Sequence, residues 1–247
     1  MRHIEFERLH NFRDMGGYRS ADGRTVVWGR LYRSDSLGKL RGADWDRFLA
    51  LGVRTVVDLR YPWEIEAKGR VPEPQRFRYA NFSIEHRPYD QAEIDPALDP
   101  WRFLADRFAE VAEDGTEEIR QTIELIAAGD GPVVFHCTSG KDRTGLIAAL
   151  LLTLLDVSRD QILDDFALTE LATERLIADW RAANPDRVLK WPGYGRAPAE
   201  VMRLVLDDLT ERHGSVRGYV TGHLGVADDV IAALRERFLT GPDGEVA

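Results

Sequence analysis

Apolar positions in the first 155 residues follow patterns typical of alternating strands and helices. Residues 53–59 are β-branched and apolar, which predicts a buried strand, and shorter strands are predicted at 77–82 and 133–135. A short helix is predicted over 43–51. The run 144–155 is too apolar for a surface helix, so we expect a helix buried at the centre of the domain.

The flanking segments predict a hairpin and a helical remainder. Asp22-Gly23 favours a tight turn between 17–20 and 25–28. Helices are predicted at 101–112, 116–128, 159–183, 197–212 and 226–239, with a loop at 191–195. The segment 85–100 contains Pro88, Pro96 and Pro100 together with Asp90, Glu93, Asp95 and Asp99, a composition that predicts a mobile connection and a conceivable lid.

These elements predict one α/β domain over residues 1–247, with a largely parallel central sheet flanked by helices, an N-terminal hairpin and a helical C-terminal part. The net charge of -9 argues against nucleic-acid binding and against docking to anionic membranes. The longest apolar run is too short for stable membrane insertion, and residues 1–8 lack a signal-peptide core, so we expect a soluble cytoplasmic protein.

Cysteine and lysine are both rare in this chain. Cys137 is the only cysteine, which excludes an internal disulfide, a thiol relay and a cysteine-rich metal site. Positive charge is carried mainly by arginine, and the lysines are Lys39, Lys68, Lys141 and Lys190. We expect no metal and no cofactor, and the sequence leaves the oligomeric state open.

The segment 136–145 carries the candidate chemistry. It connects a predicted strand to the buried helix, an arrangement in which successive backbone N–H groups and the helix dipole favour one bound anion. Five residues separate Cys137 from Arg143, so the loop can bend round one phosphate with both side chains reaching it. The same groups would stabilise a Cys137 thiolate, the nucleophilic form.

Other residues of this segment have expected supporting roles. Arg143 offers a planar fork for two phosphoryl oxygens. We expect His136 to orient the loop from behind, Gly140 to allow an unusual backbone conformation or close ligand approach, and Gly145 to let the helix pack closely on the sheet. The Thr144 hydroxyl could donate to the thiolate. The expected phosphate-binding residues are Thr138, Ser139, Gly140, Lys141, Thr144 and Gly145.

Other chemistry for the segment 136–145 has to be compared with phosphate binding. Cys137 could be a buried inert thiol. A nucleotide-binding P-loop is excluded because no glycine stands five residues before Gly140 and Asp142 occupies the Ser/Thr position. Arsenate reduction by a thiol relay needs further cysteines. Two alternatives stay open: a rhodanese-like sulfurtransferase, and a module that recognises phosphate without turnover.

The order His-Cys-x-x-Gly-x-x-Arg-Thr-Gly at 136–145 resembles the signature loop of the protein tyrosine phosphatase superfamily. With the segments 11–18 and 57–60, the Gly-Lys-Asp-Arg-Thr version is similar to atypical bacterial tyrosine phosphatases that also accept phosphoserine, phosphothreonine and phosphoinositides. The match spans about residues 8 to 239. It implies a three-layer sandwich, metal-independent hydrolysis of phosphomonoesters through a cysteinyl-phosphate, and a phosphorylated protein or phosphoinositide as substrate.

Such a reaction needs a general acid, for which there are three candidates. Asp142 ranks first because it resembles the aspartate of Lys-Asp-Arg loops in the multi-specific enzymes. Asp58 ranks second, at the end of a predicted strand where neighbouring strands converge, although an ion pair with Arg60 is an equal alternative. The acidic residues of 90–99 rank third, with a solvated loop as the better interpretation.

Residues outside the loop are weighed in the same way. Lys141 would add a cation that favours substrates with more than one phosphate, while the acidity of the whole chain opposes binding to lipid surfaces. The residues Arg13, Asp14, Arg33 and Ser34 match the N-terminal family motif, and a structural role is expected for them. Trp191 and Tyr194 could shape a wall over the pocket or hold their own loop against the core.

Overall fold

The computed structural model describes residues 2–84, 87, 94–95 and 97–241. Its centre is a sheet with the strand order β1-β2-β5-β3-β4. The strands are β1 (Arg13–Asp14), β2 (Leu31–Ser34), β3 (Thr55–Asp58), β4 (Arg78–Asn81) and β5 (Val133–His136). Only the pairing of β1 with β2 is antiparallel within this sheet. The predicted largely parallel sheet is confirmed.

Alternate residues of the central strands enter two separate hydrophobic cores. Val56 and Val134 pack with Phe48 on one face of the sheet. Val57 and Val133 pack on the other face with the central helix. The central strands are therefore buried on both faces, which explains why they read in the sequence as continuous apolar runs.

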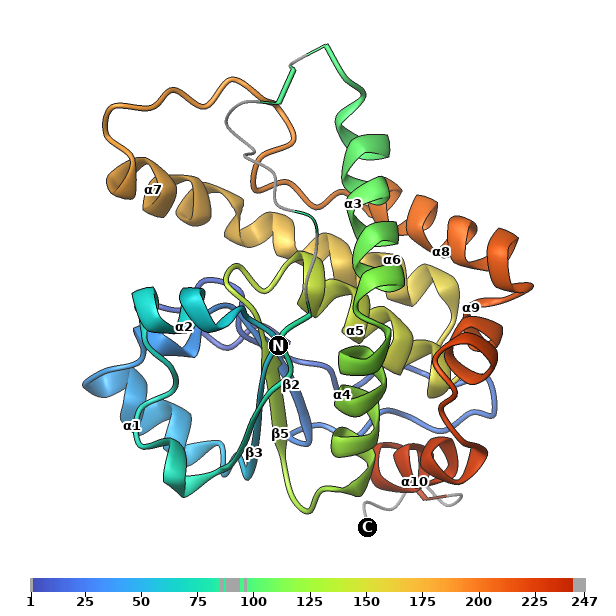
Figure 1. Cartoon of the computed structure of the whole chain (residues 1–247). Coiled ribbons are helices and arrows are strands. Elements are labelled where there is room, and N and C mark those ends of the chain that lie inside the picture. The colour runs from blue at the N-terminus through green and yellow to red at the C-terminus, as the bar shows by residue number, and fades with distance from the viewer. Residues whose placement is uncertain (1, 85–86, 88–93, 96, 242–247) are drawn as a thin grey trace.

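Helices form the two outer layers (Figure 1). α1 (Ala43–Ala50) and α2 (Pro62–Lys68) lie on one side of the sheet. The other side carries α3 (Pro100–Asp114), α4 (Thr116–Ala128), α5 (Asp142–Leu154), α6 (Arg159–Ala167), α8 (Ala199–His213), the short α9 (Val216–Gly218) and α10 (Asp228–Phe238). α7 (Thr173–Ala183) projects away from this layer, above α2 in the view of Figure 1. The predicted α/β sandwich is confirmed.

Several shorter predictions are also confirmed. The central helix α5 is buried along almost its whole length, as its apolar density predicts. The turn at Asp22-Gly23 closes a minimal hairpin in which Arg19 and Thr25 form an antiparallel bridge. No helix among the described residues is long and apolar enough to cross a membrane.

One helix prediction is wrong, and one helix is missing from the predictions. The single helix expected over 159–183 is broken into α6, a 3-10 segment Leu168–Ala172, and α7. The break turns the Thr169 hydroxyl toward Asn11 and Arg13, contacts that no helical periodicity encodes. In addition, no helix is predicted at α2, a seven-residue helix with one buried side chain, Glu64, because it has no apolar periodicity.

The predicted mobile connection at 85–100 is only partly testable. Asp90 and Glu93 lie outside the described residues. Pro100 begins α3 and does not belong to a loop. The Asp99 carboxylate accepts hydrogen bonds from the backbone N–H groups of Trp101 and Arg102, so it caps the helix.

Candidate functional site

The loop between β5 and α5 lies at the carboxyl ends of the parallel strands, the edge where α/β folds place their ligands. Cys137 follows β5 directly and is 2% exposed. α5 begins at Asp142, two residues earlier than expected, so Arg143 belongs to the first helical turn rather than to the loop. Residues 137–141 therefore curve between a strand end and a helix N-terminus.

Gly140 has two separate reasons to be glycine. Its φ angle of +68° is in the left-handed region. A Cβ on Gly140 would also lie 2.5 Å from the carbonyl oxygen of Ser34 on β2. The expected need for an unusual conformation is confirmed. A Cβ on Gly145 would meet Phe166 of α6 at 2.9 Å, so its close approach is to a helix and not, as expected, to the sheet.

The N-terminal motif holds the loop from below. The Asn11 amide donates hydrogen bonds of 3.0 Å to the carbonyl oxygens of Ser139 and Gly140. Arg33 donates to the same Gly140 oxygen at 2.9 Å. These contacts hold the Ser139 and Gly140 carbonyl groups on the side of the loop away from the expected anion. The backbone N–H groups of the loop can then face the anion.

Two buried arginines of that motif share one carboxylate. Arg13 and Arg33 contact Asp165 of α6 at 3.2 Å and 2.6 Å, and all three side chains are at most 1% exposed. Burial, followed by the charge of Arg13, lowers the pKa of Arg33 to about 10. Burial alone would raise the pKa of Asp165, but the two arginines hold it at about 2. Asp14 accepts hydrogen bonds from the backbone of Gly16 and Gly29.

Arg143 is fixed by a carboxylate from α2. Its two terminal nitrogens lie 2.7 Å and 3.0 Å from the carboxylate oxygens of Glu64, and one of them also donates to the Leu59 carbonyl at 3.2 Å. Burial would raise the pKa of Glu64, but the Arg143 hydrogen bonds and charge hold it at about 2. The pKa of Arg143 is raised against the effect of its own burial by the same partner. The Thr138 hydroxyl donates to Glu64 as well.

Asp58 lies behind the loop in a closed network. Both of its carboxylate oxygens accept from Arg60, at 2.8 Å and 2.6 Å, and it accepts from the Tyr79 hydroxyl at 3.1 Å. Asp58 and His136 are fully buried, with 3.5 Å between the carboxylate and the ring Nε2. Burial would raise the pKa of Asp58, but the charges of His136 and Arg60 lower it. This geometry favours the ion-pair interpretation.

Lys141 and Asp142 lie side by side at the top of the loop. Their Nζ and Oδ1 atoms are 3.4 Å apart, and neither atom has a hydrogen-bond partner among the described residues. Lys141 is 2% exposed, whereas 25% of the Asp142 side chain is exposed. The buried Thr144 hydroxyl also has no partner among them. The site therefore holds polar groups that a ligand could satisfy.

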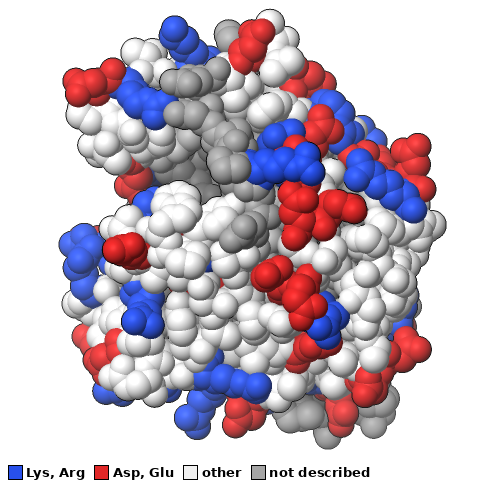
Figure 2. Space-filling view, viewed as in Figure 1, with Lys and Arg blue, Asp and Glu red and all other residues white. Residues whose placement is uncertain are grey.

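A pocket of about 360 Å³ lies over the loop. Its lining residues come from the loop (Thr138, Ser139, Lys141, Asp142), from the segment after β2 (Ser36, Lys39), from α2 (Lys68), from α7 (Leu176, Asp179, Trp180, Ala183) and from the chain around Asn184, Tyr194 and Gly195. Figure 2 shows the surface hollowed on the left, between the parts that carry α7 and α2. Acidic and basic side chains are interspersed on the rest of that face.

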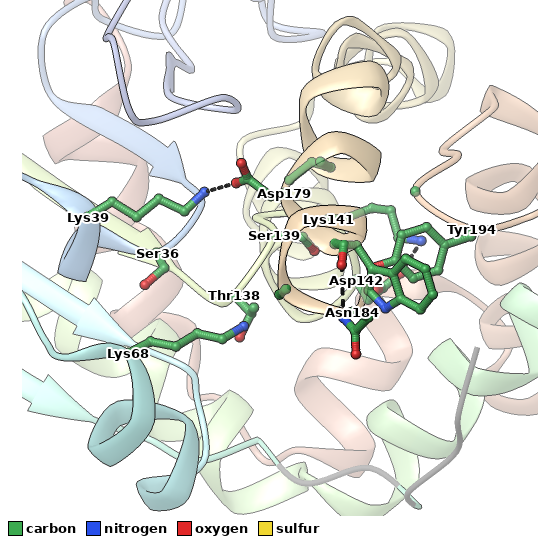
Figure 3. A pocket seen from close by; sticks show the side chains of 14 residues that line it. Ser36, Lys39, Lys68, Thr138, Ser139, Lys141, Asp142, Asp179, Asn184 and Tyr194 are labelled. Atoms are coloured by element: carbon green, nitrogen blue, oxygen red, sulfur yellow. Dashed lines mark hydrogen bonds and ion pairs between the residues drawn. The ribbon is translucent and has the colours of Figure 1, made fainter. Parts of the chain in front are cut away.

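The pocket walls differ in character (Figure 3). Lys68 reaches toward Thr138 from one side, and Lys141, Asp142 and Tyr194 lie together on the other. Tyr194 packs against Trp180, with ring centroids 5.5 Å apart. Trp191 is instead 2% exposed and contacts Phe103, so it holds its own loop against the core.

Sequence reasoning missed Asn11, Lys39, Glu64, Lys68 and Asp165 as parts of the site. Asn11 stands inside the N-terminal motif, which is a signal that could have been used. Glu64 and Lys68 have no such signal because they belong to the unpredicted helix α2. Among the described residues, no three His, Cys, Asp or Glu side chains gather in a way that could hold a metal ion.

A largely parallel sheet, with a loop between its central strand and the N-terminus of a buried helix, defines an α/β fold whose loop can bind an anion. The chain belongs to the tyrosine phosphatase family, whose family model matches residues 4–240. It is therefore a phosphatase, a hydrolase of phosphate esters.

Similar proteins are found in several bacteria. The chain is 33% identical to a protein of Cupriavidus necator that carries the name of a tyrosine-protein phosphatase, over 96% of this chain and 89% of that one. It is 27% identical to the triple specificity protein phosphatase PtpB of Mycobacterium tuberculosis, over 85% and 90% of the two chains. The solved structure of TpbA from P. aeruginosa is 20% identical over 77% of this chain and 96% of that one, with a TM-score of 0.31, which gives no support for a shared substrate.

Proposed function

We propose that the protein hydrolyses phosphomonoesters without a metal ion, through a cysteinyl-phosphate intermediate on Cys137. One observation carries this proposal: Cys137 begins the loop, Arg143 lies in the helical turn that follows it, both are nearly buried, and Asn11 and Arg33 bind the Ser139 and Gly140 carbonyl groups of the loop. This arrangement leaves backbone N–H groups and the α5 N-terminus to bind the phosphoryl oxygens.

In the first step, the Cys137 sulfur attacks phosphorus, so that a P–S bond forms while the P–O bond to the leaving group breaks. Arg143, oriented by Glu64, binds two of the phosphoryl oxygens as charge builds on them. Asp142 is the proposed general acid that gives its proton to the leaving oxygen, because it borders the pocket whereas Asp58 does not.

In the second step, water attacks phosphorus and the P–S bond breaks. The Asp142 carboxylate takes the water proton, which returns the acid to its starting state. Thr144 has a buried hydroxyl in the same helical turn as Arg143, and it donates a hydrogen bond to the departing Cys137 thiolate. His136 positions the cysteine from behind through its place in the Asp58 network.

The proposed substrates include phosphotyrosine, phosphoserine and phosphothreonine esters and phosphoinositides. The similar protein of M. tuberculosis is named as a triple specificity phosphatase, and the pocket here has both an aromatic wall and lysines. Because the pocket walls contain both aromatic and charged side chains, we do not expect the enzyme to require an aryl ester.

The test is hydrolysis of an aryl phosphate in the presence of a chelator. Wild type should turn over, Cys137→Ser should lose activity by at least about a thousandfold, and acid quenching should trap phosphate on wild-type protein. Turnover that survives Cys137→Ser, or that disappears with the chelator and returns with added metal, would overturn the proposal.

A further inference from the structure

The lysines of this chain are concentrated at one place. Of Lys39, Lys68, Lys141 and Lys190, the first three line the pocket over the loop, although they come from three separate parts of the fold. Elsewhere the described surface ion pairs are made by arginine. An ammonium group can move to meet different anion positions, which the planar guanidinium fork does less easily.

The three pocket lysines differ in what they already bind. Lys39 is committed, because its Nζ lies 2.8 Å from Asp179 and 3.2 Å from Asp35. Lys141 is buried beside Asp142 and lacks a hydrogen-bond acceptor among the described residues. The Lys68 side chain is exposed, and its Nζ makes no hydrogen bond or ion pair with any residue that the structure describes. The ammonium groups of Lys68 and Lys141 therefore face the pocket with N–H donors that no described residue accepts.

Several cations lie near Lys68, together with the carboxylate of Glu64. Partial desolvation, and then the charges of Lys39, Arg60 and Arg143, lower its pKa, with Glu64 acting in the opposite direction. Since Glu64 is already taken up by Arg143, the charge of Lys68 is not neutralised by a direct partner. An uncompensated positive charge beside a phosphate site attracts a further anion.

We propose that Lys68 forms a second anion-binding position, which takes a second phosphoryl group on the same substrate molecule while Cys137 attacks the first. This inference rests on the proposed function. In Figure 3, the side chains of Lys68 and Lys141 lie on opposite sides of Thr138. Both line one pocket of about 360 Å³ together with Thr138 and Ser139, the residues that follow Cys137, so a substrate that reaches both anion positions needs a compact scaffold. A ring of the size of a cyclitol or sugar bisphosphate meets that requirement better than an extended acidic phosphopeptide.

The experiment compares a cyclitol bisphosphate with the matching monophosphate, each as the free ester and as a short-chain lipid headgroup. Wild type should prefer the bisphosphate in kcat/KM. In Lys68→Met, which keeps most of the apolar stem, this preference should fall about tenfold, the size expected for one charge-assisted contact. Lys68→Arg should restore part of it. Lys190→Met, which changes the one lysine outside the pocket, should keep both the preference and the activity of wild type.

If wild type prefers the bisphosphate equally as the free ester and as the lipid, the phosphorylated ring alone is recognised. If it prefers the bisphosphate only in the lipid form, the second anion belongs to a lipid headgroup. Two results would overturn the subsite. One is a preference for the bisphosphate that is unchanged in Lys68→Met. The other is that Lys68→Met lowers kcat/KM for an acid-flanked phosphopeptide by the same factor as for the bisphosphate. Equilibrium binding of the two esters to Cys137→Ser, with and without Lys68→Met, repeats the comparison without turnover. Loss of aryl phosphate hydrolysis by wild type would instead contradict the proposed function itself.

Discussion

Both carboxylate oxygens of Glu64 bind the guanidinium of Arg143, at 2.7 Å and 3.0 Å, so a helix on one side of the sheet fixes an arginine that belongs to the buried helix on the other. The pair is nearly inaccessible to solvent, with side-chain exposures of 7% and 8%. A bidentate pair of this kind sets the plane of the guanidinium as well as its position. The remaining N–H donors are then directed before any substrate arrives.

The Glu64→Gln variant should lower kcat/KM for an aryl phosphate by about tenfold or more, because an amide offers Arg143 one acceptor atom in place of two and turns an NH2 donor toward the second guanidinium nitrogen. Inhibition by inorganic phosphate should weaken in parallel, since the same donors bind the product. The matched control is Glu66→Gln, an exposed position on the same helix. Unchanged kinetics in a folded Glu64→Gln protein would show that Arg143 is oriented without this partner.

The same pair predicts a dependence of stability on pH. The pKa of Glu64 is lowered from 4.5 to about 2, so the ionised form stabilises the folded state above pH 4.5, and this contribution is lost as the pH falls toward about 2. A shift of that size corresponds to about 3 kcal/mol. Urea unfolding at about pH 6 and about pH 3 should therefore show a smaller gap between wild type and Glu64→Gln at the lower pH. A gap that is constant or widens in acid would contradict the assignment.

The sequence predicts the elements that carry the loop because they are buried on all sides. β3 and β5 are buried along their whole length and α5 along almost all of it, so each contains an uninterrupted apolar run in the sequence. The motif at 136–145 then lies between a predicted strand and a predicted helix, so the position of Cys137 relative to Arg143 follows from the order of elements alone.

The missing parts of the site depend on contacts between distant segments. α2 is short and mostly exposed, so Glu64 and Lys68 look like surface charges until the fold brings them to the loop. The 3-10 break before α7 is equally invisible, because it is stabilised by hydrogen bonds from Asn11 and Arg13, more than 150 residues away. The ranking of Asp142 over Asp58 is supported by which of the two borders the pocket, information that a one-dimensional pattern lacks.

Asp142→Asn should show its effect through the leaving group. For an alkyl or unsubstituted phenyl phosphate, whose leaving oxygen needs a proton, kcat/KM should fall about a hundredfold. For a nitrophenyl ester, whose leaving group departs as a stable anion, the fall should be much smaller. An equal loss for both esters would mean that Asp142 acts on binding and not as the acid.

Asp58→Asn should mainly reduce stability. The substitution leaves Arg60 fully buried without a charged partner, and breaking such a pair costs about 3 kcal/mol in the free energy of unfolding. The ratio of kcat/KM values for poor and good leaving groups should stay that of wild type. A variant of unchanged stability whose rate becomes sensitive to the leaving group would return the acid role to Asp58.

Gly140 offers a way to separate backbone strain from close packing. Gly140 and Gly214 have similar positive φ angles, +68° and +76°, so an alanine at either position incurs a conformational cost of about 1 kcal/mol. Only at Gly140 would the new Cβ meet backbone, the Ser34 carbonyl at 2.5 Å, whereas at Gly214 it meets open space.

Gly140→Ala should therefore lose more stability in urea unfolding than Gly214→Ala, and it alone should lose phosphatase activity, because the loop must move away from β2 to admit the methyl group. The kcat/KM values of Gly140→Ala and Gly214→Ala for an aryl phosphate are compared to measure the loss of activity that the displacement causes. If both variants kept wild-type kcat/KM, the contact between the loop and β2 would not be what holds the N–H groups on the phosphate. If both variants lost activity equally, the conformational cost of alanine at a positive φ angle would explain the loss. The contact with Ser34 would then have no separate effect on activity.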